Sequence, residues 1–206
     1  DIPLLRRRLE KTMQRAALPA GSHDAKALSH ILETFPRDEL FQISDDQLFH
    51  TSLGIVHLQD RKRVALFVRE DGFERFMSCL IYVPRDRYKM ALRRAIQDIL
   101  CEAFAGEMAA HHAEIGASPL ARLHLIIRTK PGKIPPYEVQ ALEARLVAAA
   151  RSWTDRLSEA LADRYGEESV NELLQRYGEA FDAGYRETHD SAQAIEDIRE
   201  IERLLE

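Results

Sequence analysis

The residues best placed for chemistry form a short basic corner, in which Arg85 and Arg87 flank Asp86. The corner lies where an apolar, strand-like run ends and a helix-like run begins. Free N–H groups and the dipole at the start of a helix attract anions. Arg85, Asp86 and Arg87 are therefore the candidate effector or anion site, suited to a small carboxylate or phosphate. The structural alternative is that Asp86 caps the helix while both arginines are solvated or paired with acids.

Three histidines are candidate metal ligands. His111 and His112 are adjacent on a possible strand, so their side chains point to opposite faces and do not easily chelate one ion. His124 lies mid-strand among apolar residues, and we interpret it as a packed core histidine. The sequence therefore predicts no metal site.

No catalytic residue is predicted either. Cys79 has no histidine or acid close to it in the sequence, and its spacing from Cys101 fits neither a disulfide framework nor a zinc site. The chain lacks G-x-S-x-G, P-loop, G-x-G-x-x-G and H-E-x-x-H motifs, so no cofactor-binding residue is predicted. A free-standing enzyme is consequently the least favoured class of function.

The elements that must position the corner lie between residues 63 and 128. Apolar runs at 63–69, 76–83 and 122–128 alternate with the period of strands, and a weaker strand is possible at 107–115. An amphipathic helix follows the corner, with Asp86 as its expected N-cap and Gly106 as its C-cap. The run 76–83 is apolar on both faces, which predicts a central strand.

The resulting order is strand, strand, helix, strand, strand, helix, a cyclic shift of the ferredoxin-like βαββαβ order. We therefore predict an α+β fold, with an antiparallel sheet, helices on one face and an open second face. Asp71-Gly72 predicts the turn of the first hairpin.

Helical arms are predicted on both sides of this sheet. The first arm contains three predicted helices. One covers residues 3–18, the second runs from Ser22 or Asp24 to Pro36, and the third begins at a capping box formed by Ser44 and Gln47. The longest predicted helix runs from about 136 to 165, and its apolar stripe is too long to cover a four-stranded sheet alone. Part of it is expected to pack on a neighbouring helix or subunit. Two shorter helices are predicted at about 168–181 and 191–206.

Composition places few limits on function. The 206 residues are 45% hydrophobic and 31% charged, with a net charge of −5, so nucleic acid is not an expected partner. There is no apolar run of about 20 residues to span a membrane and no signal peptide. Two cysteines fit a reducing, cytoplasmic location. The start at Asp1 and a helical pattern still running at Glu206 suggest a piece of a longer polypeptide.

Several segments of the chain resemble one known family. They are LFQIS (40–44), LQDRKRVALFVRED (58–71), FMSCLIYVPRDRY (76–88), ARLHLIIRT (121–129), LEARLVAAARSW (142–153) and RYGEAF (176–181). Together they resemble the N-terminal, ACT-like regulatory region of the large bacterial NAD-specific glutamate dehydrogenases. The strand that leads into YVPRDRY is the most specific of them.

This resemblance implies an ACT-like domain in a homo-oligomeric oxidoreductase that is controlled by amino-acid effectors. It implies NAD-dependent conversion of L-glutamate to 2-oxoglutarate and ammonia in a catalytic domain downstream, with NAD held in the parent enzyme and no cofactor here. An ordinary ACT domain begins with a strand and a Gly-bearing loop, whereas a helix at 44–58 comes first here. That departure favours an assembly role over effector binding.

We therefore expect a noncatalytic regulatory or assembly segment, with an amino-acid-sensing ACT-type module as the alternative. The expected division is a helical lead-in at 1–60, an ACT-like core at 61–130 and a helical connector at 131–206. The expected partners are other domains of the parent chain and a second copy bound through the sheet or the long helix, with an amino-acid effector as a further candidate.

Overall fold

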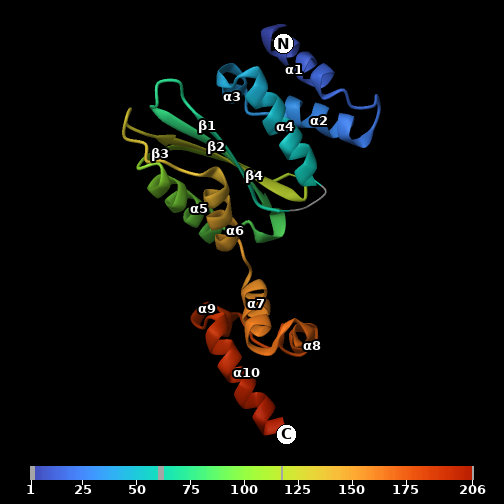
Figure 1. The fold of residues 1–206 in the computed structure, drawn as a ribbon, viewed down its shortest axis with the longest axis vertical. Helices are drawn as coiled ribbons and strands as arrows, with labels where there is room; N and C mark the ends of the chain where they lie inside the picture. The colour runs from blue at the N-terminus through green and yellow to red at the C-terminus, as the bar shows by residue number, and fades with distance from the viewer. Residues whose placement is uncertain (1–2, 60–62, 117, 206) are drawn as a thin grey trace. The chain divides into compact units, whose positions relative to one another are not determined.

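The computed structural model describes residues 3–59, 63–116 and 118–205, which form two compact units, Asp1–Ala150 and Arg151–Glu206. The first unit holds a four-stranded antiparallel sheet with helices on both sides (Figure 1). Its elements are α1 (Pro3–Ala16), α2 (His23–Thr34), α3 (Arg37–Gln42), α4 (Asp45–Gln59), β1 (Ala65–Glu70), β2 (Phe76–Pro84), the 3₁₀ turn η1 (Arg85–Arg87), α5 (Met90–Ala103), β3 (Glu107–Glu114), β4 (Leu120–Arg128) and α6 (Val139–Ala149). None of the helices described is both long and apolar enough to span a bilayer.

The strand order is β1-β2-β4-β3, and every neighbouring pair is antiparallel. A cyclic shift of the ferredoxin-like order gives this arrangement, so the predicted fold class is confirmed. β2 lies between β1 and β4, as its two apolar faces predicted. The undecided segment 107–115 is an edge strand, β3, whose residues are mostly exposed.

The first face of the sheet carries the main apolar core. Leu66, Cys79, Ile81 and Leu125 lie on this face and pack with apolar side chains of α5 and α6. Strict alternation along each strand places these residues on one side. This is the helix-covered face that the sequence predicted.

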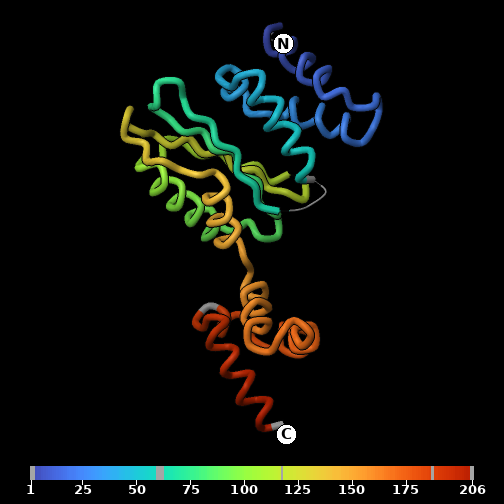
Figure 2. The backbone as a smooth tube through the Cα atoms, viewed as in Figure 1, coloured from blue at the N-terminus to red at the C-terminus, as the bar shows by residue number. Residues whose placement is uncertain are grey.

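The second face is not fully open, which corrects the prediction. Ala65, Leu80, Tyr82 and Leu120 project from it into a second core formed with α2, α3 and α4. Figure 2 shows the chain of these helices passing over the sheet on the side opposite α5 and α6. The helical lead-in therefore covers β1 and β2 because those strands are apolar on both faces, while β3 remains exposed.

Two predicted helix ends also need correction. The expected helix over 136–165 is two helices, because the chain leaves α6 at Ala150 and Ser152 caps a new helix with Asp155. Ser-x-x-Asp here is a capping box that the apolar periodicity concealed. Gly106 is not the C-cap of α5; Phe104 is, and Ala105 adopts the left-handed conformation with φ 47°.

The hairpin between β1 and β2 differs from the expected tight Asp-Gly turn. The strands are joined by residues 71–75, and the left-handed residue is Glu74, with φ 54°, and not Gly72. Asp71 N–H donates to the Phe76 carbonyl at 2.9 Å, which closes this wider loop.

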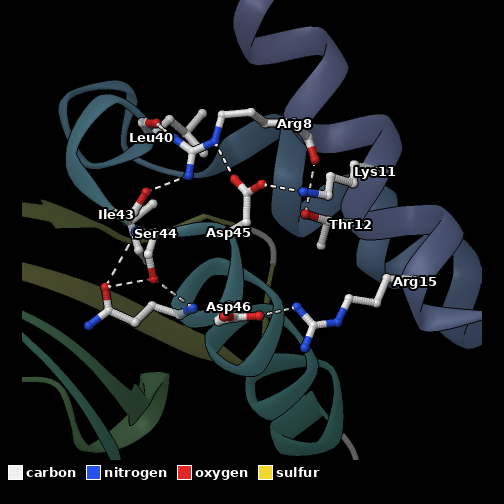
Figure 3. A network of polar contacts seen from close by, with 10 residues as sticks. Arg8, Lys11, Thr12, Arg15, Leu40, Ile43, Ser44, Asp45 and Asp46 are labelled. Atoms are coloured by element: carbon white, nitrogen blue, oxygen red, sulfur yellow. Dashed lines mark hydrogen bonds and ion pairs between the residues drawn. The ribbon is translucent and has the colours of Figure 1, made fainter.

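The basic residues of α1 clamp α3 and α4 (Figure 3). Arg8 donates to the Leu40 and Ile43 carbonyls at the end of α3, and its Nε lies 2.9 Å from Asp45 at the start of α4. Lys11 reaches the other Asp45 oxygen at 2.7 Å. Arg8 thus provides hydrogen bonds to carbonyls at the C-terminal end of α3 and pairs with Asp45 at the N-terminus of α4, where the helix dipole favours an acid. The predicted capping box of Ser44 and Gln47 is also present.

The second unit consists of α7 (Trp153–Tyr165), α8 (Glu167–Tyr177), α9 (Ala183–Thr188) and α10 (Ser191–Leu205). Its core contains Trp153, Leu157, Leu161 and Ile198, all buried. The second half of the predicted long stripe therefore has its own core, since α7 packs on α8 and α10.

Candidate functional site

The corner at residues 85–87 differs from the predicted strand-to-helix junction. Arg85–Arg87 form a 3₁₀ turn, and α5 begins only at Met90, after an N-cap at Lys89 that makes no side-chain capping bond. The prediction that Asp86 caps the helix was therefore wrong. The intervening 3₁₀ turn displaces the start of α5 beyond the reach of that carboxylate.

Arg85 connects the end of β2 to the loop before β4. Its N–H donates to the Pro119 carbonyl at 2.9 Å, and its Nη1 donates to the Gly116 carbonyl at 3.1 Å. Arg85 and Asp86 are exposed, and Arg87 is half-buried. The three predicted site residues therefore lie together at the surface. None of them lines the large polar cavity on the second face of the sheet.

A larger polar site lies on the second face of the sheet, beside the part that the helical lead-in covers. It is a cavity of about 680 Å³ between α3 and the strands. The register places its polar residues in rows across the sheet. Arg69 is opposite Ser78, and His124 on β4 is opposite His112 on β3. Directly opposed residues share a face, so these side chains lie on the same side of the sheet.

A buried ion pair forms one wall of this cavity. Glu39 on α3 is only 3% exposed. Arg69 binds it through two nitrogen–oxygen contacts of 2.8 Å each. His124 Nε2 lies 3.6 Å from the same carboxylate and 2.9 Å from the Ser78 hydroxyl. The four side chains are thus one network, and its members come from α3 and three different strands.

The network decides the charge of Glu39. Burial raises the pKa of this carboxyl, but hydrogen bonds from Arg69, His124 and Ser78 together lower the pKa to about 2. The carboxylate is therefore ionised at neutral pH. It is fixed by its partners, so we regard it as a wall of the cavity and not as an acid or base for catalysis.

Arg122 on β4 also lines the cavity. Its Nη1 donates to the Thr34 carbonyl at 2.7 Å and its Nη2 pairs with Glu114. Each terminal nitrogen of a guanidinium carries a second hydrogen. Arg122 can therefore bind a further acceptor without giving up either contact.

The structure assigns different surroundings to the other residues considered from sequence. His124 was predicted to be a packed core histidine, but it is half-buried and belongs to a polar network with Ser78 and Glu39. His111 approaches Arg93 at 3.5 Å. Burial raises the pKa of the Cys79 thiol, which makes it a poor nucleophile. Across the residues that the structure describes, no three potential metal ligands gather.

Sequence reasoning missed Glu39 and Arg69. A signal for Arg69 was present, because it follows Ala65 and Phe67 on the face that the structure buries. A charged residue at such a position needs a partner when buried. Nothing local indicated that the partner would be Glu39, 30 residues earlier on another element.

Comparison with known proteins places almost the whole chain in one family. Residues 2–61 match the model of glutamate dehydrogenase helical motif 1, residues 65–154 that of the glutamate dehydrogenase ACT2 domain, and residues 160–204 that of glutamate dehydrogenase helical motif 2.

Full-length relatives give the same result. The chain is 41% identical over 204 residues to the NAD-specific glutamate dehydrogenase of Halomonas elongata. It is 35% identical over 206 residues to that of Pseudomonas aeruginosa and 32% identical over 218 residues to that of Mycobacterium tuberculosis. These matches cover 99–100% of the chain but only 13% of each relative. The chain belongs to the NAD-specific glutamate dehydrogenase family, and it contains the ACT2 domain between two helical motifs.

Proposed function

We propose that this chain is a noncatalytic regulatory and assembly segment of a cytoplasmic, homo-oligomeric, NAD-dependent glutamate dehydrogenase. Conversion of L-glutamate to 2-oxoglutarate and ammonia, with NAD as cofactor, would take place in another part of that protein. The observation that carries the proposal is the unbroken series of helical motif 1, ACT2 domain and helical motif 2. We retain the division into a lead-in at 1–60, a core at 61–130 and a connector at 131–206 as part of the proposal.

Self-association is proposed through the sheet. The apolar stripe of the expected long helix is divided between two cores, with Leu142 and Leu146 in one and Leu157 and Leu161 in the other. That stripe is therefore already used within each unit. β3, by contrast, is an edge strand with exposed residues, and such an edge has unpaired backbone groups that can pair with another chain.

Light scattering of the 206-residue chain over a range of concentrations tests the assembly role. We expect a dimer or larger species. A strictly monomeric mass at the highest concentration would remove the self-association part of the proposal. A parallel assay with L-glutamate and NAD tests the noncatalytic part, because measurable glutamate oxidation by this chain would contradict it.

An amino-acid sensor at Arg85, Asp86 and Arg87 is the second candidate function. One observation favours it. No side chain caps the N-terminus of α5, so the N-cap position is not occupied by the Asp86 carboxylate. An effector carboxylate could take that place, with Arg85 beside it. Melting curves of wild type and Arg85→Ala with a panel of L-amino acids test this. One amino acid should stabilise the wild type alone, and identical curves would count against the sensor.

A further inference from the structure

We propose that the cavity on the second face of the sheet is a binding site for a small organic carboxylate. The proposal goes beyond the proposed function, because it places a ligand at the cavity and not at residues 85–87. Its volume of about 680 Å³ lies within the range of about 300–1,000 Å³ that is usual for small-molecule sites.

The charge of the lining favours an anion. Arg37, Arg69 and Arg122 line the cavity against two acids, Asp38 and Glu39, which leaves one positive charge in excess. Arg69 pairs with Glu39, and Arg122 pairs with Glu114, which lies outside the lining, so Arg37 is the lining arginine that has no ion-pair partner among the residues that the structure describes. A carboxylate would accept hydrogen bonds from a planar guanidinium in a geometry that this group matches well.

The hydrogen-bonding capacity of the lining points the same way. The side chains of Arg37 and His112 make no hydrogen bond or ion pair with any residue that the structure describes, although both line the cavity. Arg122 has five N–H donors, and its contacts to Thr34, Glu114 and Tyr82 engage three of them. The oxygens of Glu39 are already held by Arg69. The lining therefore has more free donors than free acceptors, which suits a ligand rich in acceptors.

The site is held in place by buried structure. Arg122 and His124 have side chains only 15% and 12% exposed, and their strand pairs on both sides within the sheet. α3, which carries Arg37, is fixed to β1 by the pair of Glu39 and Arg69. Preorganised donors lower the cost of ordering side chains around a ligand.

Two kinds of carboxylate share this chemistry, an acidic α-amino acid and a dicarboxylate without an amine. Asp38 is an exposed acceptor at the rim, next to Arg37. It offers a position for an ammonium group and would favour the amino acid over the amine-free acid. Inorganic phosphate serves as the non-carboxylate anion.

The test is isothermal titration calorimetry of the 206-residue chain with L-glutamate, L-aspartate, succinate and inorganic phosphate. We expect saturable binding of at least one carboxylate at one site per chain. Arg37→Ala and His112→Ala should each weaken it about tenfold, the loss typical of a charge-assisted hydrogen bond. Both residues are exposed, so both variants should fold, which circular dichroism would check. Arg94→Ala removes an equally exposed arginine from α5, on the other side of the sheet, and should bind as wild type does.

Each other outcome has a definite meaning. Absence of binding by all four probes would overturn the cavity proposal, while the assembly role, which is read from molecular mass, would be untouched. Binding that survives in Arg37→Ala and His112→Ala but is lost in Arg85→Ala would place the ligand at the corner. That result would overturn the cavity site and support the sensor. Equal binding of phosphate would overturn the assignment to carboxylates.

Discussion

Arg69 on β1 holds both carboxylate oxygens of Glu39 on α3, with Nε 2.8 Å from one oxygen and Nη2 2.8 Å from the other. The side chains are 11% and 4% exposed. This pair ties α3 of the helical lead-in to the sheet, together with the contacts of His124 to Glu39 and of Arg122 to the Thr34 carbonyl. A buried, bidentate pair fixes geometry more strictly than apolar contact does.

Removing one partner of this pair should be costly. Arg69→Ala leaves the Glu39 carboxylate buried without its main partner, and we expect the free energy of unfolding to fall by about 3–5 kcal/mol. The double variant Glu39→Leu/Arg69→Leu should recover most of that loss, because no charge remains buried. Urea denaturation of the single and double variants measures this. Equal stability of Arg69→Ala and wild type at neutral pH would contradict it.

The same pair should make stability depend on pH. The pKa of Glu39 is about 2 in the folded chain, against an ordinary value of 4.5. Its contribution is therefore complete above about pH 4.5 and is lost as the pH falls toward 2, since the unfolded chain then binds the proton first. The lost stability should approach about 3 kcal/mol. Denaturation midpoints at several acidic pH values should fall more steeply for wild type than for Glu39→Gln; parallel curves would refute the assignment.

Arg8 should be the residue that fixes α1 in place. Arg8→Ala leaves the Leu40 and Ile43 carbonyls and Asp45 without this donor, so we expect a loss of about 2 kcal/mol in the free energy of unfolding. Early proteolysis within α1 should accompany it. Arg6→Ala is the control, because its exposed pair with Glu10 should contribute no more than about 0.5 kcal/mol. Equal effects of the two substitutions would argue against the clamp.

Gly106, which lies between α5 and β3 in the chain, is required by close packing against the end of β4. A Cβ at this position would lie 2.6 Å from the Arg128 carbonyl oxygen and 2.6 Å from Ile127 Cγ2. Gly106→Ala should therefore destabilise the first unit by about 1–3 kcal/mol, since the backbone must shift. Gly72→Ala meets no atom within 4 Å and serves as the matched control. Thermal melting of both variants distinguishes them, and a Gly106→Ala melt as high as that of Gly72→Ala would show that the backbone yields easily.

Ser152 should set the stability of the second unit. Its hydroxyl accepts from the Asp155 N–H at 3.0 Å, and its own N–H donates to the Asp155 carboxylate at 2.9 Å. Ser152→Ala should cost about 1 kcal/mol. Trp153, the single tryptophan, is buried in this unit and reports its unfolding by fluorescence. Thr154→Ala, inside the helix, should have little effect; a comparable loss there would show that the capping box is not the cause.

Much of the fold was predictable because its signals are local. The alternation of Val64, Leu66 and Val68 with Ala65 and Phe67 recurs in the structure as two opposite faces packed in two cores. The capping box of Ser44 and Gln47 marked the start of α4 correctly. The signal that divides the expected long helix into α6 and α7 was also local, since it is the capping box at Ser152. The continuous apolar periodicity across both helices concealed it. The effector site at Arg85, Asp86 and Arg87 remains a prediction.

By itself, the sequence determined β1, β2 and β4, most of the helices and the central position of β2, because the period of apolar residues records which side of each element is buried. Only the tertiary structure decided that the helical lead-in covers part of the second face, and that Glu39 meets Arg69 and His124 there. Those contacts join residues far apart in the chain. Their partners follow from how whole elements pack and align in register, which no local pattern encodes.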